Sequence, residues 1–543
     1  MDLKKLGLKL QKKFPKTKKL SPEVVAEKWL KMKAKKTTSE QIVKPIVKIN
    51  GKNFTGESHG EAIDNAKMEG IDTSEVDREE DGKFMTSKGN ILDRKQAKKR
   101  FGISHSHEIG TDRKFIVVTK DFSGLGFAVQ ELARGTEVVM AYKLADSIDE
   151  DEIDAYMKVG EGMVEKYQLD DLMDKRDSLK DCYWIWDGNH NFQEGEMLRG
   201  EGFKVFGGTE FTFQLENDRE FGAKFAESCG LVSPPTFEFT SPEEGLSFLE
   251  EHEETAYVFK PNETDDNSLT YVPMSEDPMH ANKEVQRLIE AYRTNPATSS
   301  YILQEKVQGV EVNVEAFFIN GVPYFAHANF EDKFNHQKDT GEATGCAFDV
   351  DFEIKMESRL YQETVGKMEQ SLAEIAYTGL ADANVIVSDD RVYFLEFCFR
   401  LGYNAAPNFF FNLSNKTCLQ TLADMIDGIQ DIKAKSGFGA SMTIFTDKYK
   451  TGLPIHIPER LENKCFIFDG YMEDEILKMA GIGHEIVIVN EHNYTIKSAL
   501  VDVVDSSSFI QFKNCYFRRD ADDCKYALSP ISRYEALECM KYL

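Results

Sequence analysis

An apolar run near position 396 carries one acid and one base where a core strand would normally carry neither. Val392 to Gly402 reads VYFLEFCFRLG, with Glu396 and Arg400 among aromatic and aliphatic residues. A charge within a buried strand has to be paired with another group or bound to a metal. The two charged residues therefore indicate a functional site on this strand.

A second stretch, residues 301–349, has the texture of several consecutive strands. An apolar segment ends on Gln304-Glu305-Lys306-Val307, and Glu311 to Glu315 then alternates as a half-buried strand should. Asn320-Gly321 predicts a two-residue hairpin turn. The following strand runs into a stretch rich in charge and glycine, Lys338 to Gly345, which we expect to be a loop.

Together these stretches resemble the ATP-grasp fold, and within it the glycinamide ribonucleotide synthetase (phosphoribosylamine–glycine ligase) family. The resemblance is carried by KDTG and TG in residues 338–345 and by LEF.FR.G at 395–402, with further likeness in YKTG at 449–452 and YFRRDADD at 516–523. It extends over roughly residues 114–534. It implies an ATP-dependent ligase that forms an amide through an acyl phosphate, and the N-terminal part suggests a divergent, phage-encoded member.

The resemblance implies a set of nucleotide-binding residues. A cationic residue on the predicted helix Asp218–Ser228 is Lys224, with Arg219 as the alternative, and Lys260 at a strand end contacts phosphate oxygens. The segment 262–270 closes over the phosphates. The plainer interpretation of Glu305 and Glu311 is that they are solvent-facing carboxylates. In the family, Glu305 and the backbone at Lys306 and Val307 would bind adenine, and Glu311 would accept hydrogen bonds from the ribose. The implied ATP-binding set is Lys224, Lys260, Ser268, Glu305, Lys306, Val307 and Glu311.

The resemblance also implies catalytic and metal-binding residues. Lys338, Asp339 and Thr344 would lie near the acyl phosphate, and Arg400 against the transferred phosphoryl group. Mg²⁺ would be held by Glu396. The family's second ligand is Asn, but Cys398 stands there, so the missing oxygen is assigned to Asn384, with Asp382 as the alternative. A nucleotide-binding pseudoenzyme or regulatory protein with a degenerate metal site is the competing hypothesis.

The elements that must position these residues follow a mixed pattern. From Lys114 onward short apolar strands alternate with helices, which predicts an open parallel sheet. The turn Ser123 to Gly126 either presents amides to a phosphate or is simply a tight strand–helix turn. The fold class is α/β and α+β, an ATP-grasp fold with an N-terminal parallel-sheet domain and a β-rich C-terminal domain. The predicted divisions are a Lys-rich tail 1–41, an accessory module 42–110, and domains 111–212, 213–435 and 436–543.

Composition excludes some classes of protein. No apolar run reaches membrane-spanning length, and nine scattered Cys residues include no CxxC pair, so we expect a soluble, cytoplasmic protein without a disulfide framework. Residues 1–48 hold fifteen Lys against four acids, a charge of +11, whereas the chain totals −27, which leaves −38 for the rest. So acidic a body argues against wrapping DNA. The Lys-rich arm either contacts nucleic acid or another anionic partner, or is a solvated tail.

The substrates are the least determined part of the prediction. The resemblance implies a glycine-like amino acid as the carboxylic acid and phosphoribosylamine as the amine acceptor. The segment Asp187 to Gln193 departs from the family pattern, so a different acceptor, such as a modified nucleotide or a base in DNA, stays open.

Overall fold

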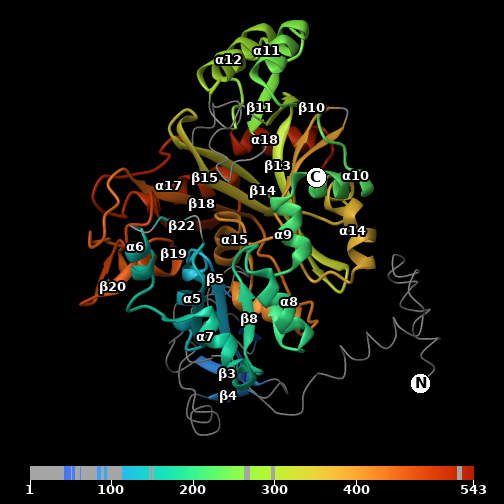
Figure 1. Cartoon of the computed structure of the whole chain (residues 1–543). Helices are drawn as coiled ribbons and strands as arrows, with labels where there is room; N and C mark the ends of the chain where they lie inside the picture. Colours follow the sequence, from blue (N-terminus) through green and yellow to red (C-terminus); the bar gives the residue numbers. More distant parts are fainter. Residues whose placement is uncertain are drawn as a thin grey trace, which may run out of the picture.

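The computed structural model describes residues 113–543 except 146–147, 150–151, 262–269, 295–299, 390 and 522–528, together with short pieces between 42 and 93. Ser268 and the Lys-rich residues 1–41 lie outside the described residues. The main body has three parts: a parallel sheet, a large antiparallel sheet above it, and a small sheet with two helices at the top of Figure 1. No described helix combines the length and the apolarity needed to cross a bilayer.

The first part confirms the predicted parallel sheet. Its five strands lie in the order β7-β6-β5-β8-β9 and all pair in parallel. The central strand β5 is buried from Phe115 to Thr119 because its apolar residues are covered on both faces. The strands are β5 (Lys114–Thr119), β6 (Glu137–Tyr142), β7 (Glu165–Gln168), β8 (Tyr183–Trp186) and β9 (Lys204–Phe206); the helices are α5 (Leu125–Leu132), α6 (Ile153–Lys158), α7 (Leu169–Asp174), η3 (Arg176–Leu179), α8 (Phe192–Gly200) and α9 (Glu210–Asn217).

The helix predicted over Asp218–Ser228 is α10 (Arg219–Ser228). Asp218 caps it, since its carboxylate accepts a hydrogen bond from the amide of Phe221. The chain then enters the small top part, a sheet in the order β10-β12-β11 that carries α11 and α12 (Figure 1). Its elements are β10 (Thr236–Phe239), α11 (Pro242–Glu251), β11 (Tyr257–Pro261), α12 (Pro278–Ala291) and β12 (Tyr301–Glu305). We call this part the lid.

The large sheet has nine strands in the order β17-β16-β13-β14-β15-β18-β22-β19, with β23 paired to β18. Asn320 and Gly321 both have positive φ, 52° and 72°, and join β13 to β14, which confirms the predicted hairpin. The strands are β13 (Val310–Ile319), β14 (Val322–His336), β15 (Thr340–Glu353), β16 (Gly379–Val387), β17 (Val392–Phe397), β18 (Phe438–Thr446), β19 (Cys465–Ile467), β22 (Glu485–Asn493) and β23 (Cys515–Tyr516).

Helices cover the large sheet and join it to the parallel sheet. One apolar cluster contains α14 and α18 residues with β13 and β16; another links α5 and β5 with α16, β19 and β22. The remaining elements are α13 (Arg359–Glu363), α14 (Val365–Glu374), α15 (Ala405–Asn408), a π-helix η6 (Phe409–Leu413), α16 (Cys418–Ile426), η7 (Glu459–Lys464), α17 (Ile496–Ser507), α18 (Pro530–Cys539) and the hairpin β20 (Tyr471–Glu473) with β21 (Ile476–Lys478).

Two observations bear on the predicted divisions of the chain. The N-terminal pieces form an antiparallel sheet β2-β1-β3-β4, in which β3 and β4 are paired. Strand β15 precedes the predicted boundary at 435/436 and β18 follows it. The two strands pair, so one continuous sheet crosses this boundary. The strands of the N-terminal sheet are β1 (Ile42–Ile49), β2 (Lys52–Thr55), β3 (Gly82–Thr86) and β4 (Ile91–Asp93).

Candidate active site

One face of the large sheet is lined with polar side chains near the lid. Alternate residues of a strand point to the same face, and paired residues on neighbouring strands do so together. The register aligns Asn384 of β16 with Glu396 of β17 and with Asn313 of β13, and Asn313 with Asn329 of β14. The polar face, as we name it, comprises Glu311, Asn313, Glu315, His327, Asn329, Glu331, Lys333, Asp382, Asn384 and Glu396.

A lysine that sequence reasoning missed lies among the carboxylates of this face. The Nζ of Lys333 is 3.8 Å from Oε1 of Glu311, and its side chain is 39% exposed. Desolvation lowers the pKa of Lys333, but the negative charges of Glu311, Glu396 and Glu331 outweigh it and leave that pKa above its usual value. The ammonium is therefore kept charged next to Glu311 and Glu396, two residues that the sequence assigned to ribose and metal.

The two predicted metal ligands are neighbours in the sheet. Glu396 is exposed, whereas Asn384 is buried and donates from Nδ2 to Oε1 of Glu311 over 3.3 Å. The Oδ1 of Asn384 and an oxygen of Asp382 are buried and make no hydrogen bond. Among the described residues, no group of three or more His, Cys, Asp or Glu side chains forms a ready metal site. Glu396 and Asn384 thus offer hard oxygens, and any further ligands would come from substrate or water.

Arg400 lies just beyond β17 and is held in place by an acid from a different part of the chain. Its Nε donates to Oε1 of Glu216, on α9, over 2.9 Å, and Nη1 donates to the carbonyl of Leu401 over 3.1 Å. The guanidinium lies over the ring of Tyr403, 5.0 Å from its centroid. Burial raises the pKa of the nearby Cys398 well above its usual value, so this thiol is neutral and is no ligand for Mg²⁺.

The lid carries the residues assigned to adenine and phosphate. Lys260 is on β11, paired with Ile302 of β12, and Glu305 ends β12. The amides of Glu305 and Lys306 donate to the carbonyls of Pro235 and Ala256, so neither amide is available to an adenine.

Lys306 and Lys224, both assigned to the nucleotide, differ in their surroundings. The Nζ of Lys306 donates to the carbonyls of Pro273 and Ser275 and to the carboxylate of Glu276, which fixes the end of the lid strand. Lys224 is exposed on α10, whose other face packs Phe225 against Phe397 of β17.

The segment Lys338–Gly345 is not the loop that the sequence predicted. Lys338 and Asp339 both have positive φ, 59° and 51°, in a hairpin turn, and β15 begins at Thr340. The pairing of β15 with β14 satisfies backbone groups that a loop would leave to solvent or ligand. The structure thus corrects the predicted loop to a turn followed by a strand.

The ends of this segment have different surroundings. The amide of Lys338 donates to Asp520 over 2.8 Å, and the carboxylate of Asp339 pairs with Arg518 at 3.0 Å. Thr344 donates to the carbonyl of Lys333 over 2.9 Å. The adjacent Gly345 lies against the ring of Tyr403. Thr344 is therefore tied to the backbone of Lys333, on the polar face, whereas Lys338 and Asp339 dock on the C-terminal segment.

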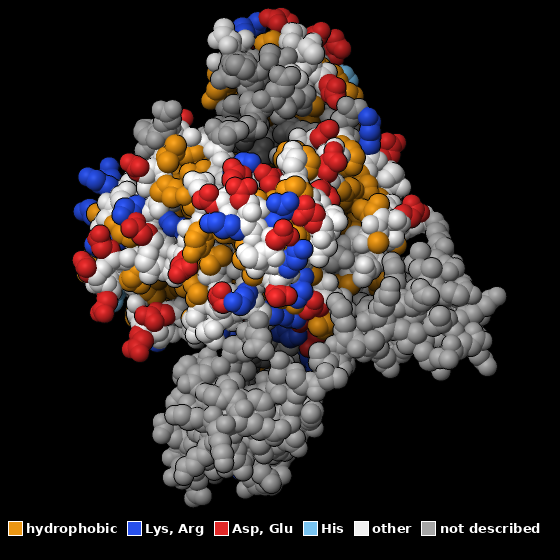
Figure 2. Space-filling view, turned by 60° about the horizontal axis from the view of Figure 1, so that its bottom comes forward, with side chains coloured by type: hydrophobic (Ala, Val, Ile, Leu, Met, Phe, Trp, Pro, Cys, Tyr) orange, Lys and Arg blue, Asp and Glu red, His pale blue; other side chains and the backbone are white. Residues whose placement is uncertain are grey.

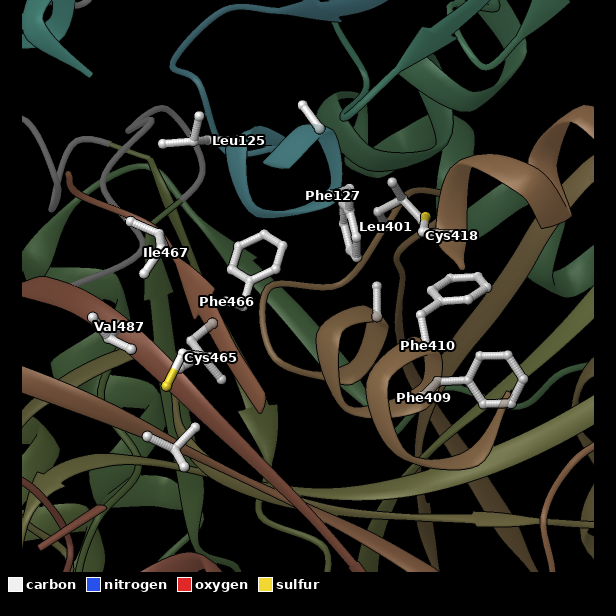
Figure 3. Packing of buried hydrophobic residues seen from close by; sticks show 14 of the residues in the cluster. Leu125, Phe127, Leu401, Phe409, Phe410, Cys418, Cys465, Phe466, Ile467 and Val487 are labelled. Atoms are coloured by element: carbon white, nitrogen blue, oxygen red, sulfur yellow. The ribbon is translucent and has the colours of Figure 1, made fainter. Parts of the chain in front are cut away.

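A pocket lies where the parallel sheet meets the large sheet. It is lined by residues that follow β5 and β8, by the end of α9, by the segment after β17, and by β19. The strand order reverses between β5 and β8, and open parallel sheets bind ligands at such a point. Figure 3 shows Phe127, Leu401 and Phe466, all part of this lining, directed toward one another from three separate elements. We call it the junction pocket; Arg400 is one of its walls.

The turn after β5 has its amides directed inward. The amide of Gly124 donates to Oδ2 of Asp187 over 2.8 Å, and that of Ser123 donates to Oδ1 of Asp121 over 3.0 Å. Of the two interpretations of this turn, the geometry favours the tight strand–helix turn over a phosphate-binding one.

Comparisons with known proteins agree with this architecture. Residues 217–405 match the family model of the phosphoribosylglycinamide synthetase ATP-grasp (A) domain. That range includes the residues assigned above to nucleotide, metal and phosphoryl group. A phosphoribosylamine–glycine ligase of Chlorobaculum tepidum is 23% identical over 340 residues, which cover 60% of this chain and 79% of that protein.

Two further relatives extend the likeness. The human trifunctional purine biosynthetic protein adenosine-3 is 22% identical over 353 residues, 60% of this chain, and the match spans only 33% of the human protein. The solved structure of a phosphoribosylamine–glycine ligase from Thermotoga maritima aligns with a TM-score of 0.56 at 14% identity, covering 75% of this chain and 99% of that one. These relatives are human and bacterial, and a phage origin gains no support. Residues 217–405 are thus similar to an ATP-grasp domain, the fold is that of the ATP-grasp proteins, and the chain resembles phosphoribosylamine–glycine ligase.

Proposed function

We propose that the protein joins a carboxylic acid, of the size and kind of glycine, to an amine at the expense of ATP. An oxygen of the acid attacks the γ-phosphorus of ATP, ADP leaves, and an acyl phosphate forms. The nitrogen of the amine then attacks the acyl carbon, inorganic phosphate leaves, and the nitrogen loses a proton. The named relatives support the glycine-like acid, because two of them are phosphoribosylamine–glycine ligases.

The position of Arg400 carries this proposal. Its guanidinium is held by Glu216 between the polar face of the large sheet and the junction pocket. A fixed guanidinium between a nucleotide site and a second pocket is suited to the acyl phosphate, whose charge it can neutralise in both steps. Thr344, which donates to the carbonyl of Lys333, is the polar group of the hairpin best suited to assist; Lys338 and Asp339 would act by holding the hairpin.

The nucleotide would lie between the lid and the polar face. Lys260 and Lys333 supply cations against the triphosphate, and Lys224 and Ser268 extend the set assigned from the sequence. Glu305, Lys306 and Val307 border the adenine, and Glu311 accepts hydrogen bonds from the ribose. This placement of the nucleotide is supported by the proximity of Lys333 to Glu311 and Glu396.

Mg²⁺ fits the residues present. Glu396 and Asn384 would hold it, because the carboxylate is exposed and the amide oxygen of Asn384 has no hydrogen-bond partner. The ion would supply charge neutralisation for the phosphates. The pseudoenzyme hypothesis is not favoured, since its motivation was Cys398, and oxygen donors stand beside that thiol.

The direct test measures whether the release of ADP from Mg²⁺-ATP depends on glycine. In parallel, hydroxylamine traps the acyl phosphate as a hydroxamate. Hydroxylamine replaces the amine, so this assay needs no knowledge of the acceptor. We expect hydroxamate formation by the wild-type protein and a loss of about 100-fold in Glu396→Ala. Glu357→Ala, at an exposed acid after β15, is the matched control. A panel of small amino acids that yields no hydroxamate would refute the proposal.

A further inference from the structure

We propose that the amine acceptor carries no phosphate group, and that the junction pocket binds a neutral or positively charged amine. This inference rests on the proposed ligase function and names the class of its second substrate. It departs from the phosphoribosylamine that appears in the names of the relatives. Three features of the pocket support it.

The first feature is the turn after β5, where a phosphate would need free amide donors. The amide of Phe122 donates to Oγ1 of Thr119 over 2.7 Å, and that of Leu125 donates to the carbonyl of Phe122 over 3.0 Å. The amides of Ser123 and Gly124 donate to Asp121 and Asp187. All four consecutive amides are thus used within the protein, and two carboxylates occupy the place of an anionic ligand.

Close packing reinforces this arrangement. A Cβ built on Gly124 would lie 3.0 Å from Cβ and Oδ2 of Asp187 and 2.9 Å from Cγ1 of Val117. Asp187 is therefore in direct contact with the turn, and a phosphate cannot enter between them without displacing it. Displacement would leave a buried carboxylate, only 5% exposed, without its amide donor.

The second feature is the balance of charge. The pocket is lined by three acids, Asp121, Asp187 and Glu216, and by two cations, Lys120 and Arg400, of which Arg400 is paired with Glu216. A phosphorylated ligand would add two negative charges beside Asp121 and Asp187. The resulting electrostatic repulsion is larger in a pocket of low dielectric constant than in water.

Asp187 has a histidine neighbour that also lines the pocket. His190 lies 2.9 Å from Oδ1 of Asp187 through Nε2, and its Nδ1 is 3.1 Å from Nδ2 of Asn191. A neutral imidazole satisfies both contacts, because it donates to the carboxylate and accepts from the amide. These two contacts therefore require no positive charge on His190.

The third feature is an aromatic wall facing these acids. Tyr403 lies 5.9 Å from Phe468 between ring centroids, and Phe127 lies 4.8 Å from Phe466. Rings together with carboxylates favour an ammonium group, which is attracted to the ring faces and paired by the acids. Burial and the neighbouring charge of Asp187 raise the pKa of Asp121, and a cation bound beside this carboxyl would favour its ionised form.

The test compares amines that differ only in a phosphate: ethanolamine with O-phosphoethanolamine, and glucosamine with glucosamine 6-phosphate. Binding to the full chain is measured by ligand-observed NMR and calorimetry in the presence of Mg²⁺-ADP. We expect the unphosphorylated member of each pair to bind at least about tenfold more tightly. Asp121→Asn should weaken the binding of the unphosphorylated amines and reduce the difference in affinity within each pair. This variant keeps the side-chain oxygen that accepts a hydrogen bond from the amide of Ser123. Asp181→Asn, an exposed acid at the opposite end of the same sheet, should change neither.

Tighter binding of the phosphorylated members, or equal binding within both pairs, would overturn the inference. Hydroxylamine trapping reports separately on the ligase proposal, because it needs no acceptor. Hydroxamate formation with a preference for phosphorylated amines would therefore leave the proposed function standing and refute only the acceptor class.

Discussion

Lys333 illustrates how a single side chain shapes the candidate site. Its ammonium lies among Glu311, Glu331 and Glu396, where it offsets part of their repulsion. The backbone at this point is fixed by Thr344, which donates to the carbonyl of Lys333. Burial raises the pKa of Glu331, while the charge of Lys333 opposes that rise. The lysine therefore holds together acids that would otherwise separate or take up protons.

Replacing Lys333 by Met should weaken Mg²⁺-ATP binding by about 10- to 100-fold, because a cation facing the triphosphate is lost while three carboxylates remain. Calorimetric titration with Mg²⁺-ATP measures the change. Lys355→Met, at an exposed position after β15, is the control and should bind as the wild type does. Unchanged affinity in Lys333→Met would show that the lysine serves the acids of the sheet and not the nucleotide.

At the scale of elements, His327 joins three strands of the large sheet. Its Nδ1 lies 2.9 Å from Asp351 of β15, and its Nε2 lies 2.7 Å from Glu315 of β13. The ring is fully buried and stacks on Phe409 of the π-helix with centroids 4.4 Å apart. Both ring nitrogens face carboxylates, so both must donate, and the ring is an imidazolium. This buried ion triad is part of the polar face and ties three of its strands together.

The triad predicts a pH dependence of stability. Desolvation lowers the pKa of His327, but Asp351 and Glu315 outweigh it and raise that pKa to about 10. An unfolded histidine titrates near ~6.5, so the stabilisation is fully present below that pH and is lost as pH rises through 10. Over this interval the free energy of unfolding should fall by up to about 1.4 kcal/mol per pH unit from this group.

Urea unfolding at several pH values between 6.5 and 9.5 measures the fall, and ¹⁵N NMR of the imidazole ring identifies its source. His492 is an internal control, because burial lowers its pKa and it should titrate at a lower pH in the same spectra. Titration of His327 near neutral pH would contradict the assignment of an imidazolium.

Some elements could be predicted because their signals are local. The helix near residues 218–228 and the turn at Asn320-Gly321 need only neighbouring residues. The hairpin turn at Lys338-Asp339 could not be predicted, because two non-glycine residues adopt positive φ there. The nearby Gly341 is the residue that a sequence-based prediction would choose for such a conformation. Lys333 was not among the predicted site residues, because the direction of its side chain depends on a register shift between β14 and β15. The alternation of His327, Asn329, Glu331 and Lys333 in an apolar strand was the signal available.

At the scale of the whole molecule, charge distribution bears on the proposed partners. On the face shown in Figure 2, the described acidic and basic side chains are interspersed, and no continuous basic area stands out. An interspersed surface with a net acidic chain offers little attraction to a nucleic acid backbone. The hypothesis of a nucleic acid partner thus depends on the Lys-rich residues 1–41, which lie outside the described part of the chain.

The C-terminal residues are built into the central part of the molecule. Strand β18 pairs with β15 from Phe438 to Met442, so the two sides of the predicted boundary share hydrogen bonds. The amide of Leu360 donates to the carbonyl of Tyr542 over 2.9 Å, and the fully buried Tyr542 shares an apolar cluster with β13 and β16. Arg533 on α18 is paired with Asp332 on β14. These ties join residues 436–543 to the strands and helices that precede them.

We therefore expect residues 436–543 expressed alone to give no cooperative unfolding transition, because β18 would become an open edge and the apolar face of α18 would lose its cover. Co-expression with residues 1–435 should restore a stable complex, since the sheet can then reform between the two fragments. Circular dichroism during urea unfolding measures the first outcome, and co-purification measures the second. A cooperative transition in the isolated fragment would mean that the boundary at 435/436 separates two independent domains after all, and that the shared sheet forms only when they dock.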